Sequence, residues 1–219
     1  MKQIALICAY NEEKHVKEVV SNTLKYVNNV IVINDGSKDN TLNELKKTKA
    51  IILNHEINKG KGEALKTGFK YCLDNKYDSI ILLDADGQHD PSEIPKLINK
   101  LNEGYDIVVG ARKRKGTNMK LVRRASNFLS SSIISLILKQ KISDTQSGYR
   151  IIRSNILKNI ELTLSKYDLE SEILIKAAKK GYKIGNVEIR TIYGDEISSI
   201  HPVKDVLRFF RMIYKALKW

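Results

Sequence analysis

Residues 80–91 read Ile-Ile-Leu-Leu-Asp-Ala-Asp-Gly-Gln-His-Asp-Pro, so that four apolar residues run directly into Asp84 and Asp86. The apolar run predicts a buried strand. Burial and mutual repulsion make two neighbouring carboxylates costly at its end, unless a cation or water stabilises their charge. The stretch therefore predicts a strand that delivers a pair of acidic side chains to a polar site.

Short apolar runs rich in Ile and Val recur along the first half of the chain and alternate with helical patterns. The helical pattern is clearest where Ala64, Leu65, Phe69 and Cys72 fall on one face of a helix. Near-continuous apolar strands that alternate with helices predict a parallel sheet with helices on both faces. The expected strands are Gln3–Cys8, Val30–Ile33, Ala50–Leu53, Ile80–Leu83 and Ile107–Val109.

Beyond about Gly110 strands become sparse and the pattern is mostly helical. No repeat, low-complexity tract or linker interrupts the sequence, so we expect a single domain over residues 1–219. Two helix starts are marked by candidate caps. Asp39 precedes one, and Asp90 precedes the other, followed by Pro91 and by Glu93 three residues on. Asp90 is therefore predicted to cap a helix rather than to bind a ligand.

The composition narrows the class of protein. No apolar run approaches the roughly 18 residues of a membrane-spanning helix, and the N-terminus enters a strand pattern directly, so we expect neither a span nor a signal peptide. Cys8 and Cys72 lie in apolar surroundings without metal-ligand spacing, which predicts reduced cysteines in a cytosolic compartment. The net charge of +13 indicates an anionic partner: nucleic acid, a phosphorylated substrate or an acidic membrane surface.

Polar residues follow each expected strand. In an open parallel sheet the carboxyl ends of the strands meet at one rim, where ligands bind, so these residues are expected to converge. Any one of these polar clusters can be explained by residues that stabilise a loop or cap a helix. Several such clusters at the same edge of the sheet favour a binding site instead. The clusters are Cys8-Ala9-Tyr10-Asn11-Glu12, Asn34-Asp35-Gly36-Ser37, Asn58-Lys59-Gly60-Lys61-Gly62, Asp84-Ala85-Asp86-Gly87-Gln88 and Gly110-Ala111-Arg112.

The chemistry of the rim suits a nucleotide and a divalent cation. Asp35 can accept hydrogen bonds from the ring N–H groups of a base. Asp84, Asp86 and Gln88 offer the hard oxygen ligands that Mg²⁺ or Mn²⁺ prefers. Such a cation would hold a diphosphate, and the nearby lysines and Arg112 add positive charge.

As an ordered set, these motifs resemble those of the family-2 inverting glycosyltransferases, which have the GT-A fold. The resemblance is carried by Tyr10-Asn11-Glu12, residues 34–41 (NDGSKDNT), residues 58–62 (NKGKG) and residues 84–88 (DADGQ). Residues 110–112 (GAR) and 144–150 (DTQSGYR) narrow it to the dolichyl-phosphate mannosyltransferases and other polyprenyl-phosphate sugar transferases. It extends over nearly the whole chain. It implies a Rossmann-like α/β fold, with a mostly parallel sheet between helices and a mostly helical acceptor-side C-terminal part.

The resemblance implies roles for individual residues. Residues 1–112 would form the nucleotide-sugar and metal half, and residues 113–219 the acceptor and membrane-surface half. Asp86 and Arg112 would be catalytic. The metal ligands, for Mg²⁺ or Mn²⁺, would be Asp84, Asp86 and Gln88. The nucleotide-sugar residues would be Cys8, Tyr10, Glu12, Ile33, Asp35, Asp84, Ala85, Asp86, Arg112 and Arg190.

The implied reaction is inverting transfer of a hexose from a nucleoside-diphosphate sugar, of the GDP-mannose or UDP-glucose type, to a polyprenyl or dolichyl phosphate. A lipid phosphate is already an anion and needs no base, so the metal and Arg112 would act by neutralising the departing diphosphate. Transfer to a polysaccharide or another hydroxyl acceptor is the alternative, and it requires a general base. Asp168, Glu170 and Glu172 are the candidates for that base, although their spacing equally fits the start of a helix. Ile197 stands where dolichyl-phosphate enzymes tend to carry a Lys, which leaves the donor and the acceptor open.

The last third of the chain suits a lipid acceptor. Residues 121–138 form either a packing helix or an interfacial helix, and Arg123 and Arg124 near its start are candidates to bind the acceptor phosphate. Residues 203–219 predict a basic amphipathic helix suited to an anionic membrane surface. We therefore expect a peripheral protein on the cytoplasmic membrane face, with an integral-membrane partner left open. A nucleic-acid-binding protein is disfavoured, because the charge is dispersed and no binding motif is present.

Overall fold

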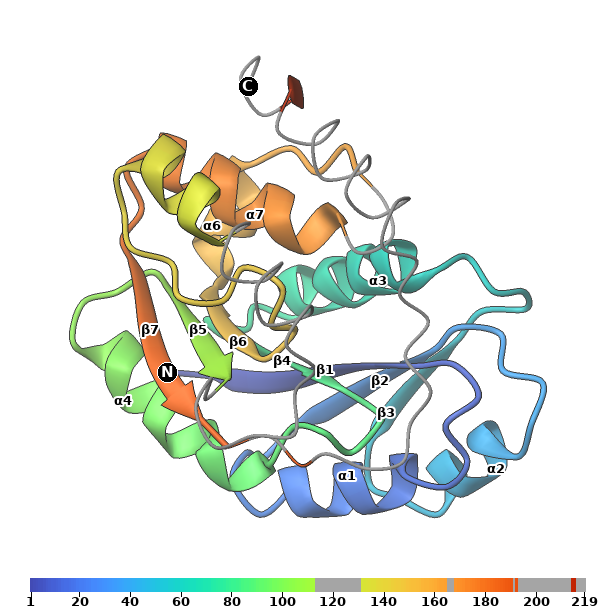
Figure 1. Ribbon diagram of the computed structural model, residues 1–219. Coiled ribbons are helices and arrows are strands. Elements are labelled where there is room, and N and C mark those ends of the chain that lie inside the picture. Colours follow the sequence, from blue (N-terminus) through green and yellow to red (C-terminus); the bar gives the residue numbers. More distant parts are fainter. Residues whose placement is uncertain (113–130, 165–167, 191, 193–213, 216–219) are drawn as a thin grey trace.

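The computed structural model describes residues 1–112, 131–164, 168–190, 192 and 214–215. Its centre is a seven-stranded sheet with the strand order β3-β2-β1-β4-β6-β5-β7 (Figure 1). β6 is antiparallel to both of its neighbours, and all other neighbouring strands are parallel. The strands are β1 (Gln3–Ala9), β2 (Val30–Asn34), β3 (Ile51–Asn54), β4 (Ser79–Asp84), β5 (Ile107–Arg112), β6 (Arg150–Arg153) and β7 (Ile184–Ile189).

The five strands expected from the apolar runs are confirmed as β1 to β5. Where the first or last residue of an observed strand differs from the expected one, the difference is one to three residues. β6 and β7 were not predicted individually. β6 has four residues, and β7 contains Gly185 and Asn186, two residue types that weaken a strand signal. The mostly parallel character of the sheet therefore follows from the sequence, whereas its antiparallel insertion does not.

Helices cover both faces of the sheet (Figure 1). On one face lie α3 (Lys61–Asp74), α6 (Ser154–Asn159) and α7 (Asp168–Lys179). On the other lie α1 (Val16–Thr23), α2 (Thr41–Lys46) and α4 (Ile94–Asn102). Successive side chains of a strand point to opposite faces, so β1 sends Ile4 and Leu6 into the core beneath α3 and sends Ala5 and Ile7 into the core beneath α1.

Residues 131–138 are also helical. Ile134 and Leu138 are buried in the core that includes α3 and α7, whereas Leu136 is 82% exposed. The described part of residues 121–138 therefore packs on the domain through one face, as expected of a packing helix. Within the described residues, no helix is both long enough and apolar enough to cross a bilayer.

The predicted cap at Asp90 is present, whereas the N-cap residue of α2 is Asn40, which makes no side-chain cap hydrogen bond. Asp90 accepts a hydrogen bond from the backbone N–H of Ser92 at 2.9 Å and begins the short helix η1 (Pro91–Glu93). The Asp39 carboxylate accepts from the backbone N–H of Thr41 at 3.0 Å, at the first turn of α2. Asp90 is thus a capping residue, as predicted.

Gly68 sets how closely α3 approaches the sheet. An added Cβ at this position would lie 2.3 Å from Cδ1 of Leu6, which is fully buried on β1. A helix loses about 1 kcal/mol when it carries glycine in place of alanine, so close packing must compensate for this glycine.

Gly68→Ala is expected to destabilise the protein by about 1–3 kcal/mol in spite of the better helix propensity, because the new methyl group overpacks the core. Urea denaturation of both proteins measures this difference. Leu6→Ala should cost less stability in the Gly68→Ala background than in the wild type, since it removes the clashing atoms. A Gly68→Ala protein that is as stable as the wild type would contradict the close-packing explanation.

Candidate active site

A cavity of about 460 Å³ opens at the carboxyl ends of β1, β2 and β4. This size is within the range of about 300–1,000 Å³ that is common for small-molecule sites. Seven residues predicted for the nucleotide-sugar site line it together: Cys8, Tyr10, Glu12, Asp35, Asp84, Ala85 and Asp86. The remaining lining residues are Ala9, Asn58, Gly60, Lys61 and Ala64. The structure thus brings the ends of four of the expected motifs into one hollow.

The loops after β1 and β2 are bonded to each other beside this cavity. Asn11, which has a positive φ of 56°, donates from its backbone N–H to Oγ of Ser37 at 3.0 Å, and its side-chain oxygen accepts from the backbone N–H of Lys38 at 2.8 Å. The backbone N–H of Glu12 donates to Oγ1 of Thr41 at 2.8 Å. Much of the polar sequence in these two clusters therefore builds the rim, while Tyr10 and Glu12 line the cavity.

Asp35 organises the loop that enters α3. Its carboxylate accepts from the backbone N–H groups of Lys59 at 3.0 Å and Gly60 at 2.8 Å. Nδ1 of the buried His55 lies 2.7 Å from Oδ1 of Asp35 and donates to it, because an ionised carboxylate only accepts. Asp35 is 3% exposed and also lines the cavity. It therefore positions residues 55–60, and contact with a nucleobase stays a prediction.

Gly36 allows this loop to pass close by. It has a φ of +68°, and an added Cβ would lie 2.4 Å from the backbone carbon of Ile57. A side chain at this position would both strain the backbone and push residues 57–58 away from the rim.

The chain turns sharply after the paired acids. Oδ1 of Asp86 accepts from the backbone N–H of Gln88 at 2.9 Å, and Gly87 adopts a φ of +77°. The backbone N–H of Asp84 donates to Nδ1 of His89 at 3.1 Å. The buried His89 ring stacks on Tyr149, with 4.9 Å between ring centroids. The turn thus leaves Asp84 and Asp86 on the cavity wall and places His89 in the interior.

A protein cation stabilises the first of the two acids. Nζ of Lys61 lies 2.5 Å from Oδ1 of Asp84 and 3.1 Å from Oε1 of Glu170. Burial of the Asp84 carboxyl is the largest single effect and favours its protonated form, but the charge and hydrogen bond of Lys61 together with the charges of His89 and Arg150 outweigh it and lower the pKa of Asp84 to about 2. Burial acts to lower the pKa of Lys61, whereas the charges of Asp84 and Glu170 hold it above its ordinary value. The buried end of β4 therefore carries an ionised acid because α3 supplies an ammonium group.

Three predicted residues lie elsewhere. The side chain of Ile33 is fully buried in the core beneath α3, because its position on β2 turns it away from the rim. Arg112 donates from Nε to Oδ2 of Asp144 at 2.7 Å and from Nη2 to Oδ1 at 3.0 Å. Arg190 has a 75% exposed side chain, and its Nε donates to Oε1 of Glu93 at 3.0 Å. Arg123 and Arg124 lie outside the described residues.

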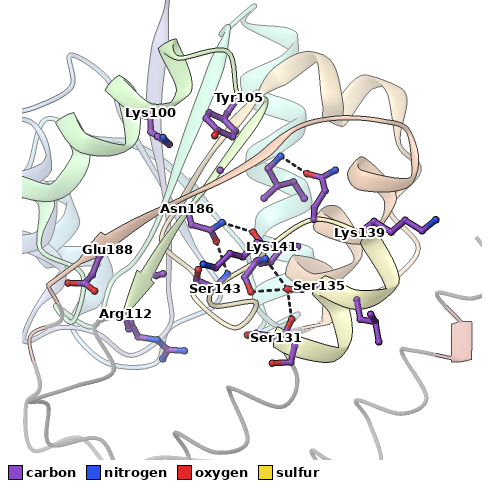
Figure 2. Close-up of a pocket in the computed structure, with 17 residues that line it drawn as sticks. Lys100, Tyr105, Arg112, Ser131, Ser135, Lys139, Lys141, Ser143, Asn186 and Glu188 are labelled. Carbon is purple, nitrogen blue, oxygen red and sulfur yellow. Dashed lines mark hydrogen bonds between the residues drawn. The ribbon is translucent and has the colours of Figure 1, made fainter.

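Arg112 lines a second cavity of about 1250 Å³, which lies along β5 and β7 beside residues 131–143 (Figure 2). Several polar groups of its wall bond to one another. Oγ of Ser135 accepts from the backbone N–H of Ile142 at 2.9 Å, and the Asn186 side chain bonds to the backbone of Lys141 and Ser143 (Figure 2). These bonds hold residues 139–143 against the edge strand β7.

Comparison with known proteins identifies the family. The family model described as glycosyl transferase family 2 matches residues 4–161. The chain belongs to glycosyl transferase family 2. It is therefore a glycosyltransferase, as its motifs predicted, and the predicted GT-A type of α/β fold is confirmed.

Two relatives and one solved structure illustrate the similarity. The UDP-N-acetylglucosamine–dolichyl-phosphate N-acetylglucosaminyltransferase of Methanococcus voltae is 35% identical over 236 residues, which cover 97% of this chain and 93% of that protein. The dolichol-phosphate mannosyltransferase of Pyrococcus furiosus is 29% identical, over 100% of this chain and 64% of that protein. Glucosyl-3-phosphoglycerate synthase from Mycobacterium tuberculosis, solved with Mn²⁺, uridine diphosphate and phosphoglyceric acid, has a TM-score of 0.75 and 18% identity, and covers 99% of this chain and 77% of its own. At that identity, the last comparison shows a shared fold.

The three candidate bases of this family-2 glycosyltransferase differ in their surroundings. Glu172 is fully buried and accepts hydrogen bonds from the backbone N–H groups of Thr163 and Leu164, besides pairing with Lys176. Asp168 stands at the start of α7. Glu170 contacts Lys61, which lines the candidate site. Glu172 thus has a structural role, and Glu170 lies beside the cavity.

The donor set at the rim fits a divalent cation that is shared with substrate. Among the described residues, no group of three or more His, Cys, Asp or Glu side chains could hold a metal ion by itself. Asp84 and Asp86 line the cavity and offer two carboxylates, whereas Gln88, the third predicted ligand, is not among its lining residues. Mg²⁺ commonly binds through one or two carboxylates together with substrate phosphates, and the rim has this composition.

No role was predicted for His55, His89 or Asp144. His89 follows the acidic motif directly, and Asp144 opens the motif DTQSGYR, so their positions were visible. The contacts of His55 with Asp35 and of Asp144 with Arg112 were not visible, because these partners are 20 and 32 residues away in sequence.

Asp35→Asn is expected to lower stability by about 1–3 kcal/mol, because an amide nitrogen would then face backbone N–H donors that need an acceptor. Hydrogen exchange should become faster at residues 55–60 in particular, and calorimetry should show weaker binding of uridine or guanosine diphosphate. Unchanged exchange at residues 55–60 would contradict the positioning role. Faster exchange with unchanged nucleotide affinity would confine Asp35 to that role.

The buried His89 should make stability depend on pH between 7 and 5. Burial lowers the pKa of its ring below the ordinary value, against the opposing charge of Asp84. The unfolded state therefore binds a proton more readily, so this contribution to stability is present above about pH 6.5 and is lost as the pH falls.

His89→Gln keeps an acceptor for the backbone N–H of Asp84 but does not titrate. The variant is expected to be less stable at pH 7, since the contact with Tyr149 is lost, and to lose less further stability between pH 7 and 5. The slope should differ by at most about 1.4 kcal/mol per pH unit in urea denaturation series. Identical slopes in the two proteins would show that His89 titrates normally.

Proposed function

We propose that this glycosyltransferase transfers a hexose, with inversion, from a nucleoside-diphosphate sugar to a polyprenyl or dolichyl phosphate, with Mg²⁺ or Mn²⁺ as cofactor. The observation that carries the proposal is the single cavity in which Asp84 and Asp86 face Tyr10, Glu12 and Asp35. Acids that suit a metal–diphosphate complex and groups that suit a nucleoside lie there side by side. The names of the two relatives support the acceptor class.

The nucleoside is placed against the loops that follow β1 and β2. Tyr10 is 42% exposed at this rim, and its ring can stack on a base while Asp35 accepts from ring N–H groups. The diphosphate then extends toward Asp86 and Gln88 at the end of β4. A bound cation would supply positive charge that neutralises the departing nucleoside diphosphate.

Arg112 and Arg190 are proposed to meet phosphate groups of the substrates. Asp144 holds the Arg112 guanidinium through two bonds, so little side-chain entropy is lost when a phosphate approaches. Glu93 restrains Arg190, and the backbone N–H of Ile192 donates to the carbonyl oxygen of Gln88 at 3.0 Å. This contact places Ile192 next to Gln88 of the proposed metal loop. Arg123 and Arg124 keep their proposed role at the acceptor phosphate.

The alternative, transfer to a hydroxyl acceptor, is favoured by one observation, the position of Glu170 beside the cavity. The same contact argues against it, because Nζ of Lys61 lies 3.1 Å from Oε1 of Glu170 and would compete with an acceptor hydroxyl for that oxygen. A lipid phosphate, which arrives as an anion, requires no such base.

The acceptor requires the protein to reach a membrane surface. We propose a peripheral position on the cytoplasmic face, with residues 1–112 as the donor half and residues 113–219 as the acceptor half of one domain. The proposed amphipathic helix of residues 203–219 lies outside the described residues, apart from Tyr214 and Lys215. An integral-membrane partner is compatible with this arrangement.

The function is tested by incubating the purified protein with UDP- or GDP-sugars, Mn²⁺ and either a polyprenyl phosphate or the matching polyprenol. Sugar should be transferred to the phosphate and not to the alcohol, and excess EDTA should abolish transfer. Asp86→Asn should reduce turnover by at least about a hundredfold, as expected when electrostatic stabilisation of the leaving group is lost.

Asp74→Asn is the matched control, because Asp74 is an exposed acid at the far end of α3. Full turnover in EDTA, or in Asp86→Asn, would exclude the metal. Transfer to the alcohol at a comparable rate would favour a hydroxyl acceptor and a base such as Glu170.

A further inference from the structure

Lys61 joins three elements inside the donor cavity. It is the first residue of α3, Asp84 is the last residue of β4, and Glu170 lies in the first turn of α7. The side chains of Lys61, Asp84 and Glu170 are 19%, 28% and 6% exposed. The ammonium group is thus shared between two carboxylates that are largely removed from water.

Both oxygens of Asp84 are closely surrounded. Lys61 lies 2.5 Å from Oδ1. On the other side, an added Cβ at Gly148 would lie 2.7 Å from Oδ2 and 3.1 Å from Nζ of Lys61, so the backbone of Gly148 packs against this ion pair. Nδ1 of His89 lies 4.0 Å from Oδ2.

A divalent cation would meet Lys61 at this position. Mg²⁺ binds carboxylate oxygen at about 2.0–2.1 Å, so an ion on Oδ1 of Asp84 would lie within van der Waals range of the ammonium group. Two cations at that separation repel strongly in a site with little water. Lys61 and a metal ion therefore cannot share this oxygen.

We propose that Lys61 competes with the divalent cation for Asp84, and that Glu170 holds the ammonium group once the cation has bound. The inference rests on the metal dependence in the proposed function. Before loading, Lys61 neutralises Asp84. After loading, the metal does so, and Lys61 keeps its contact with Glu170.

Glu170 is suited to hold the displaced ammonium group, because its Oε1 already lies 3.1 Å from Nζ of Lys61. The exchange then needs a small movement of one flexible side chain and no change in the fold. It also avoids a buried charge without a partner in either state, which would otherwise be strongly destabilising.

Binding of Mn²⁺ alone to the full chain, followed by electron paramagnetic resonance without nucleotide, tests the proposal. Lys61→Met removes the competitor and should tighten Mn²⁺ binding by about tenfold or more. Glu170→Gln removes the carboxylate that would hold the displaced ammonium group and should weaken binding. In the double variant the effect of Glu170→Gln should largely disappear, because no ammonium group then needs Glu170.

Lys59→Met is the matched control. It removes the same charge two residues before Lys61, but Lys59 is exposed, so the affinity for Mn²⁺ at physiological salt should change little. Circular dichroism establishes that each variant is folded, and Lys61→Gln replaces Lys61→Met if the latter is not.

Equal or weaker Mn²⁺ binding by the folded Lys61 variants would overturn the competition. An equal effect of Glu170→Gln with and without Lys61 would overturn the role of Glu170 and leave only a long-range charge effect. Failure of the wild-type protein to bind Mn²⁺, even with nucleoside diphosphate present, would instead exclude the metal in the proposed function. The two failures are therefore distinguishable.

Discussion

The charge of Asp84 is the constraint on which the rest of the site depends. A carboxylate at the end of a buried strand must be compensated, and Lys61 compensates it from the first residue of α3. The start of α3 is in turn positioned by Asp35, which binds the backbone of Lys59 and Gly60. Gly148 must lack a side chain so that the ion pair can pack against it. One electrostatic requirement thus links the ends of β2 and β4 to α3 and the loop before β6.

The rim around this ion pair is built in advance of any substrate. Side-chain bonds between the loops after β1 and β2, such as Asn11 to Ser37 and Lys38, fix the nucleoside side of the cavity. The turn at Asp86 and Gly87 fixes the other side. A site whose groups are already oriented loses less conformational entropy when a ligand binds. In the proposed function the same polar residues serve both structure and recognition, which is why each cluster had two explanations from sequence.

The sequence predicted the parts of the fold that have a local signal. β1 to β5 are apolar runs, and their carboxyl ends had to meet at one rim, so the donor cavity could be predicted from Cys8 to Asp86. β6 and β7 were missed because a four-residue strand and a strand with Gly185 carry little signal. The positions of Arg112 and Arg190 depend on ion pairs with Asp144 and Glu93, which are 32 and 97 residues away in sequence. A single sequence does not contain that pairing in any local pattern.

These pairings also bear on the net charge of +13. Lys61, Arg112 and Arg190, three cations at or near the rim, each have a carboxylate partner in the structure. The partners hold these cations in place at low entropic cost, and the cavity itself is lined by four carboxylates, Glu12, Asp35, Asp84 and Asp86, against one ammonium group, Lys61. The excess must therefore lie mainly elsewhere, for example on exposed lysines such as Lys139, Lys141 and Lys183. In the proposed function, a basic outer surface would attract an anionic membrane, while the acid-lined cavity would select the nucleotide by geometry.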